Sequence, residues 1–214
     1  MKKLLLVVAL TLAVTGSSYA GTCGAGDFGA SSYGAPGFSC TIGDLTFSNF
    51  SYTPSGGNGL PGVDVAITPL MGGGESGFQF NGAWGANTGV VSDAFIDYTV
   101  TAGSPVISDL VLSIAGFGFT GTGFLSVAEN ASNGINLIVC AGDPSCVQFA
   151  SATFVPVASL DISKDIQVIG GTAGTASLSS VVNETSEVPE PASLTLLGTG
   201  LIGLAGALRR KLFS

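Results

Sequence analysis

The sequence predicts an all-β fold, an antiparallel β-sandwich or jelly roll, for an ectodomain at residues 21–182. Short runs of alternating apolar and polar residues recur along this segment. Many of the 33 glycines, together with clusters of Ser, Asn and Asp, separate these runs. No run holds apolar residues at i, i+3, i+4 and i+7 for long enough to indicate a helix. A parallel β-helix is the alternative, but no internal repeat of fixed period supports it.

The expected strands follow one another at short intervals along the chain. The first, at residues 44–53, changes the phase of its alternation at Ser48 and Asn49, which predicts a bulge or bend. Residues 93–101 and 106–115 show the longest alternation. Shorter runs of the same kind predict strands at 63–67, 78–80, 125–127, 135–139, 147–155, 157–162, 166–169 and 176–182. The polar residues 183–187 are expected to form a linker after the last strand.

Charge and composition exclude several classes of function. Residues 21–187 hold one lysine, Lys164, against 13 carboxylates, a formal net charge of −12, and the whole chain has no histidine. Without histidine there is no Ser-His-Asp or Cys-His site and no His-containing zinc site. One cation cannot neutralise the phosphates of a nucleic acid. We therefore expect a protein that is not an enzyme, with no catalytic residue, no cofactor, no metal and no nucleic-acid partner.

The N-terminus has the pattern of a secretory signal peptide. Two lysines precede an apolar run at residues 4–14, and small residues stand three and one before a cut between Ala20 and Gly21. The apolar run is too short to span a membrane, which needs ~20 residues. We expect a signal peptide at residues 1–20 and a mature chain that begins at Gly21 outside the cytoplasm.

The C-terminus has three parts in a fixed order. A stiff Val-Pro-Glu-Pro segment is followed by residues 192–208, 17 residues without a charge, and then by three cations at 209–211. A helix of that length rises about 25 Å, close to the ~30 Å hydrocarbon core of a bilayer. The basic cluster should stay on the cytoplasmic side of the membrane. The pattern predicts one transmembrane helix at 192–208 and a basic stop at 209–211.

Residues 188–214 resemble the PEP-CTERM protein-sorting tail, because all three of its parts occur in order at the end of the chain. In that family the membrane-embedded transpeptidase exosortase recognises the Pro-Glu-Pro motif and removes the helix. The resemblance therefore implies a sorting motif at Val188, Pro189, Glu190 and Pro191, and stop-transfer charges at Arg209, Arg210 and Lys211. It also implies a precursor anchored in the inner membrane, and then a protein at the cell surface or in the extracellular matrix (biofilm) of an exopolysaccharide-producing bacterium.

Four cysteines in an exported chain predict disulfides. Three pairings of Cys23, Cys40, Cys140 and Cys146 are possible. Pairing within the first two and within the last two is favoured, because each bond then closes a short loop around turn residues. A four-thiolate zinc site is the competing interpretation, and it calls for two close pairs that this spacing lacks.

Few other residues suggest a site. Residues 116–121 match the pattern G-x-G-x-x-G, but no helix follows, so a glycine-rich β connection is expected. Asp143, Asp161 and Asp165 are the first candidates for a calcium site, although no calcium-loop motif surrounds them. Trp84, the single tryptophan, is flanked by amides and glycines and is a possible ligand contact, or else a core residue.

Two hypotheses about the ectodomain follow. The first is a structural or adhesive surface domain, and the second is a carbohydrate-binding module or an enzyme that acts on matrix exopolysaccharide.

Overall fold

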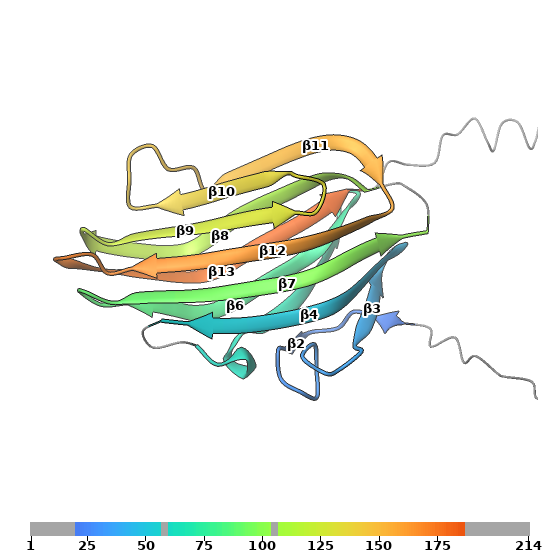
Figure 1. Ribbon diagram of the computed structural model, residues 1–214, viewed down its shortest axis with the longest axis horizontal. Coiled ribbons are helices and arrows are strands. Elements are labelled where there is room, and N and C mark those ends of the chain that lie inside the picture. The colour runs from blue at the N-terminus through green and yellow to red at the C-terminus, as the bar shows by residue number, and fades with distance from the viewer. Residues whose placement is uncertain (1–19, 57–59, 104–106, 187–214) are drawn as a thin grey trace, which may run out of the picture.

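Two β-sheets packed face to face form the protein in the computed structural model, which describes residues 20–56, 60–103 and 107–186 (Figure 1). The predicted all-β sandwich is thereby confirmed. Within those three ranges no helix is long and apolar enough to cross a membrane, and the one helical turn is the 3-10 segment η1 (Gly62–Asp64). The expected signal peptide, apart from Ala20, and the expected helix at 192–208 lie outside the described residues.

The strand order shows that the chain passes repeatedly from one sheet to the other. The first sheet has seven strands in the order β1 (Gly21–Thr22), β3 (Ser39–Ile42), β4 (Leu45–Ser55), β7 (Val91–Ala102), β12 (Ser159–Ile169), β9 (Phe124–Ala131) and β10 (Asn136–Ala141). The second has six strands in the order β11 (Phe149–Val157), β8 (Ile107–Gly121), β13 (Gly174–Ser186), β6 (Glu75–Ala86), β5 (Ala66–Gly72) and β2 (Gly26–Asp27). All pairs are antiparallel except β1 with β3.

The core lies between the sheets because alternate residues of each strand point to opposite faces. In β7 and β12 every second side chain is buried, including Ile96, Val100, Ile162 and Ile166. Aromatic rings fill the centre of the core and contact one another across the two sheets, among them Phe47, Phe78, Phe80 and Tyr98.

The predicted bulge in the first long strand is confirmed. The pairing of β4 with β7 shifts register between Ser48 and Ser51, and Asn49 takes a positive φ of 57°. Asparagine tolerates this left-handed conformation better than most residues. The shift lets β4 turn apolar side chains inward both before and after the bulge.

Two sequence-based boundaries are corrected by the structure. The strands expected at 157–162 and 166–169 are largely one continuous strand, β12, which begins at Ser159, and Val157 is instead the last residue of β11. Lys164 lies between the two expected strands and does not interrupt β12, because its side chain points into the core. Residues 183–186 are not a linker but the end of β13, where Asn183 and Thr185 are buried and make hydrogen bonds to the backbone of β8.

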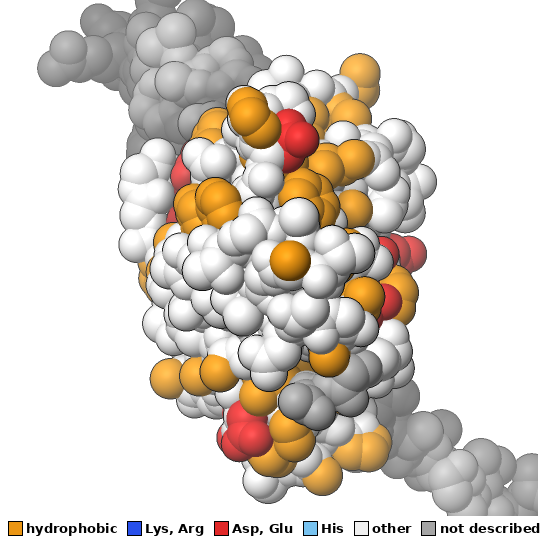
Figure 2. All heavy atoms as spheres, turned by 90° about the vertical axis from the view of Figure 1, so that its left-hand side faces the viewer, with side chains coloured by type: hydrophobic (Ala, Val, Ile, Leu, Met, Phe, Trp, Pro, Cys, Tyr) orange, Lys and Arg blue, Asp and Glu red, His pale blue; other side chains and the backbone are white. Residues whose placement is uncertain are grey.

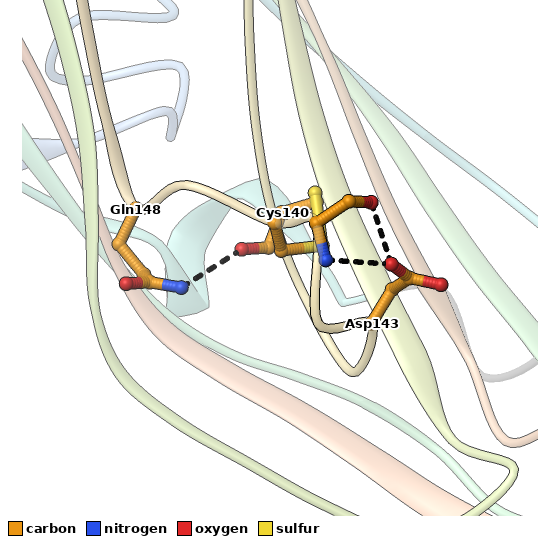
Figure 3. The surroundings of a disulfide bond; sticks show 5 residues. Cys140, Asp143 and Gln148 are labelled. Atoms are coloured by element: carbon orange, nitrogen blue, oxygen red, sulfur yellow. Dashed lines mark hydrogen bonds between the residues drawn. A yellow bond between two sulfur atoms is a disulfide. The ribbon is translucent and has the colours of Figure 1, made fainter.

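Both disulfides close short loops at the edges of the sandwich. Cys23 is bonded to Cys40, and Cys140 is bonded to Cys146. The second loop is further fixed by Asp143, which accepts hydrogen bonds from the backbone N–H and the hydroxyl of Ser145 (Figure 3). These bonds also lower the pKa of Asp143.

The described chain begins and ends at the same end of the sandwich, on the right of Figure 1. Gly21 opens β1 there, and Ser186 closes β13 opposite Glu75. The strand β13 spans the length of the second sheet, so its first residue, Gly174, lies at the opposite end from Ser186. Its 13 residues cover a distance of about 40 Å. We call the end that contains Gly174 the distal end.

Candidate functional site

A hollow of 610 Å³ lies at the distal end, across three neighbouring strands of the second sheet. Every residue that lines it is uncharged: Gly85, Ala86, Asn87, Gly118, Phe119, Thr120, Thr175, Ala176 and Ser177. Figure 2 looks at this end of the molecule and shows few acidic side chains among hydrophobic side chains, uncharged polar side chains and backbone. The distal hollow therefore suits a ligand without charge.

Glycine shapes the strand that forms one wall of the hollow. The predicted glycine-rich β connection at 116–121 is the second half of β8. Gly121 ends this strand with a φ of +54°, and a Cβ there would lie 1.7 Å from the carbonyl oxygen of Ala173. A side chain at this position would clash with the backbone, so glycine is required for β8 and β13 to stay paired up to the rim of the hollow.

Polar side chains form part of the lining of the hollow. The hydroxyls of Thr120 and Thr175 lie 3.0 Å apart, and the backbone N–H of Thr175 also donates to Thr120 Oγ1, so each side chain fixes the other. Phe119 is 48% exposed. Phe119 pairs with the buried Ala176, so its ring lies on the opposite face of the sheet from the Thr120 hydroxyl. The hydroxyls and the Asn87 amide have the composition of a site for a neutral, hydroxyl-rich ligand.

Trp84 does not line the hollow, although the residues that follow it in β6 do. It is 1% exposed, and its indole N–H donates a 3.2 Å hydrogen bond to the hydroxyl of Tyr52. The structure thus places Trp84 in the core, where no face of its ring is open to a surface ligand. The residues that sequence reasoning missed are the next three along the chain, Gly85, Ala86 and Asn87, together with Thr120 and Thr175 on the neighbouring strands.

The acidic residues on the outer face of the first sheet do not form a metal site. Asp161 accepts a hydrogen bond from Thr99, and Asp97 accepts one from Ser51. Asp161 and Asp165 are four residues apart on one extended strand, so they lie about 13 Å apart, and Asp143 is in the loop after β10. Among the described residues no group of three or more Asp, Glu, Cys or His could hold a metal ion.

Asp165, on the same outer face, has a raised pKa. Burial, with a smaller contribution from the neighbouring Asp93, raises the pKa of Asp165 from 3.8 to about 6. The contribution of Asp93 arises because two adjacent carboxylates repel each other when both are ionised.

A buried polar cluster of Lys164, Glu129, Tyr98 and Asn183 crosses the core. The amino-acid composition does not indicate it. Lys164 on β12 is 0% exposed, and its Nζ lies 3.1 Å from Glu129 Oε2 on the neighbouring strand β9. The same Nζ donates to the Tyr98 hydroxyl at 3.2 Å and to Asn183 Oδ1 of the opposite sheet at 3.1 Å. The position of Lys164 in the sequence does indicate that it is buried, because it continues the alternation of the buried residues Leu160, Ile162, Ile166 and Val168.

The C-terminal segment was compared with known families. A model described as "PEP-CTERM protein-sorting motif" matches residues 187–211, which include the Pro-Glu-Pro motif, the uncharged stretch and the basic cluster. The chain carries a PEP-CTERM sorting motif. This motif implies export, a membrane-anchored precursor and processing by exosortase. It begins directly after Ser186, the last residue of β13, and lies outside the described residues.

Comparisons of the ectodomain are distant. No curated protein matches the chain. The carbohydrate-binding module TmCBM61, solved with β-1,4-galactotriose, is 8% identical over 62% of this chain and 86% of its own, with a TM-score of 0.30. A family 11 carbohydrate-binding module of Clostridium thermocellum, solved with a mixed-linked tetrasaccharide, is 9% identical over 61% and 87%, with a TM-score of 0.23. The tailspike protein 4 domain of bacteriophage CBA120 is 13% identical over 66% and 20%, with a TM-score of 0.26. At these scores the likeness carries no argument about a ligand.

Proposed function

We propose that this PEP-CTERM protein is a non-enzymatic surface or matrix domain with a structural or adhesive role. One observation carries the proposal: the sorting motif follows Ser186 at one end of the sandwich, and the uncharged hollow lies at the opposite end. A chain held at its C-terminus therefore presents the distal hollow about 40 Å from its point of attachment. The absence of histidine from the sequence supports a role without catalysis.

Cleavage by exosortase tests whether the protein is sorted as proposed. The mature C-terminus is measured by mass spectrometry in strains of the source bacterium with and without exosortase. We expect a chain that ends near Pro189–Pro191 in the first strain and an intact 192–214 segment in the second. If Leu212, Phe213 and Ser214 persist in both strains, exosortase does not process the protein and the proposal fails.

Retention of the processed protein at the cell surface or in the matrix tests the structural or adhesive role. The same cultures are separated into cells, matrix and medium, and the protein is quantified in each fraction. The proposal expects the processed protein in the cell-surface or matrix fraction, and weaker matrix cohesion when the gene is deleted. A processed protein found free in the medium, with cohesion unchanged on deletion, contradicts a structural or adhesive role.

A second candidate function is the binding of a neutral polysaccharide in the distal hollow. The lining of the hollow favours it, because Asn87 and the hydroxyls of Thr120 and Thr175 offer hydrogen bonds without charge. A net charge of −12 in the body disfavours anionic polymers.

A glycan array with a matched pair of variants tests this second function. Thr120→Val removes a hydroxyl that lines the hollow, whereas Thr153→Val removes an exposed hydroxyl on the edge strand β11. We expect Thr120→Val to weaken binding about tenfold, or about 1.4 kcal/mol, and Thr153→Val to leave it unchanged. Equal binding by both variants, or no binding by the folded wild-type protein, rejects the hollow as a site for the glycans tested.

A further inference from the structure

The buried polar cluster places an amine against a carboxamide inside an apolar core. Lys164 Nζ lies 3.1 Å from Asn183 Oδ1, and the two residues belong to opposite sheets, on β12 and β13. The side chains of Lys164, Glu129, Asn183 and Tyr98 are each at most 2% exposed. Such a dry, fixed arrangement brings a nucleophile and a carbonyl group together without competing water.

We propose that Lys164 and Asn183 join to form an isopeptide bond that covalently cross-links the two sheets. The Nζ–Cγ bond forms and the Cγ–Nδ2 bond of the asparagine amide breaks. Lys164 starts as an ammonium group and Glu129 as a carboxylate. The lysine nitrogen keeps one hydrogen, Glu129 takes one, and the asparagine nitrogen leaves as ammonia with the third. Nothing is oxidised or reduced, and no further reactant is needed.

Glu129 is the base of this reaction. Its Oε2 lies 3.1 Å from Nζ, and within the described residues neither of its carboxylate oxygens has a hydrogen bond of good angle. The carboxylate is therefore free to receive a proton from the amine, which must be neutral to attack. Burial lowers the pKa of Lys164, while Glu129 acts in the opposite direction.

Tyr98 and the backbone of β8 position the amide. The Tyr98 hydroxyl donates to Asn183 Oδ1, the atom on which negative charge develops during the attack. The Asn183 Nδ2 group donates to the carbonyl oxygen of Val111 at 2.8 Å, which fixes the plane of the amide. Tyr98 also lies under the amine, 4.5 Å from Nζ to the ring centroid. Each contact orients one of the two reacting groups.

The core itself favours the product. Before the reaction it holds an ammonium and a carboxylate, whose removal from water carries a large desolvation cost. Afterwards it holds an amide and a protonated Glu129, so no charge remains buried. A bond from Lys164 to Glu129 is disfavoured, because an ionised carboxylate repels a nucleophile and has no good leaving group.

Intact-mass and peptide measurements on the exported wild-type protein test the proposal. We expect a mass lower than that of the disulfide-bonded sequence by one ammonia molecule. After reduction and cleavage both before Asp165 and after Leu178, we expect the peptide that ends at Lys164 to stay joined to the separate peptide that contains Asn183. The second cut keeps an uncut bond between Lys164 and Asp165 from joining the two peptides. The linked peptide is decisive, because Asn58-Gly59 and Asn133-Gly134 can also lose ammonia by forming a succinimide.

Three variants separate the roles of the cluster, and a fourth serves as control. Lys164→Arg keeps the charge without the nucleophile, Glu129→Gln removes the base, and Asn183→Ala removes the carbonyl group. We expect each of them to restore the full mass and abolish the linked peptide. Asn133→Ala, in the exposed turn after β9, should retain both the mass loss and the link.

The wild-type result alone can overturn the proposal, even where a variant does not fold. Separate Lys164 and Asn183 peptides from the wild-type protein refute the bond. A linked peptide that has lost water instead of ammonia refutes the assignment to Asn183, since it places the bond on a carboxylate. A link that persists in folded Glu129→Gln, with Trp84 emission like that of the wild type, refutes the role of Glu129 as base.

Discussion

Trp84 and Tyr52 connect the two sheets through a hydrogen bond of 3.2 Å from the indole N–H to the phenolic oxygen. Trp84 belongs to β6 of the second sheet and Tyr52 to β4 of the first. Burial is the main reason that the pKa of Tyr52 is raised, and this hydrogen bond partly opposes it. The single tryptophan therefore reports on the packing of one sheet against the other.

The burial of Trp84 predicts a protected fluorophore. In the native protein we expect blue-shifted emission and little quenching by acrylamide, and both properties should be lost on unfolding. Trp84→Ala should lower the free energy of unfolding by about 3–5 kcal/mol, because it leaves a large cavity in the core. Native emission as accessible to acrylamide as that of the unfolded chain would contradict the placement of this residue.

The ion pair in the core predicts that one substitution costs more stability than two. Lys164→Met leaves the Glu129 carboxylate buried without a cation, which should cost about 3–5 kcal/mol. Adding Glu129→Leu should recover most of that loss. Both variants lack the amine, so their difference isolates the unpaired charge and does not depend on the isopeptide bond. Chemical unfolding measures it, and a double variant no more stable than Lys164→Met argues against the effect.

The two disulfides should differ in their contribution to stability. Cys23 and Cys40 are 17 residues apart, whereas Cys140 and Cys146 are 6 apart. Loop-closure entropy then predicts losses of about 3 and about 2 kcal/mol when each pair is replaced by alanine. Urea unfolding of the two double variants checks the order. The reverse order would show that strain or unfolded-state structure, rather than loop length, dominates.

The carboxylate pair on the first sheet predicts a dependence of stability on pH. The pKa of Asp165 is about 6 in the folded protein and 3.8 ordinarily, so the folded state holds the proton more tightly. The contribution of Asp165 to stability is therefore complete below pH 3.8 and is lost as the pH rises through 6. Asp165→Asn should raise the melting temperature at pH 7.5 but not at pH 4.

The size of this effect should be small, under about 1 kcal/mol, because the group is substantially exposed to solvent. Asp161→Asn is the matched control, since it removes one charge from the same strand without touching Asp93. Equal stabilisation by the two variants at pH 7.5 would attribute the effect to net charge and not to the pair.

Sequence reasoning found most of the fold where alternation was long. The alternation at 93–101 and 106–115 predicted two strands of the sandwich, and the phase slip at Ser48 and Asn49 predicted the bulge. It failed where polar residues point inward. Lys164 and Asn183 are favourable inside only because they meet each other and Glu129, and those partners are brought together by the tertiary fold.

The candidate site was harder to predict for a related reason. The distal hollow combines β6, β8 and β13, which are far apart in the sequence and adjacent only in the sheet. Trp84 attracted attention as a large aromatic residue, but whether an aromatic side chain faces the core or the solvent depends on which face of the strand it occupies. Phe117 and Phe119, in the glycine-rich stretch of β8, are exposed, whereas Trp84 is buried.

The central place of β13 has a mechanical consequence. This strand is hydrogen-bonded to β6 on one side and to β8 on the other, and the chain leaves the sheet at its end, toward the sorting motif. A pull on that tail acts along the strand axis, so the hydrogen bonds on both sides are loaded together in shear and do not open one by one. We therefore expect the domain to resist unfolding when its C-terminal tail is pulled.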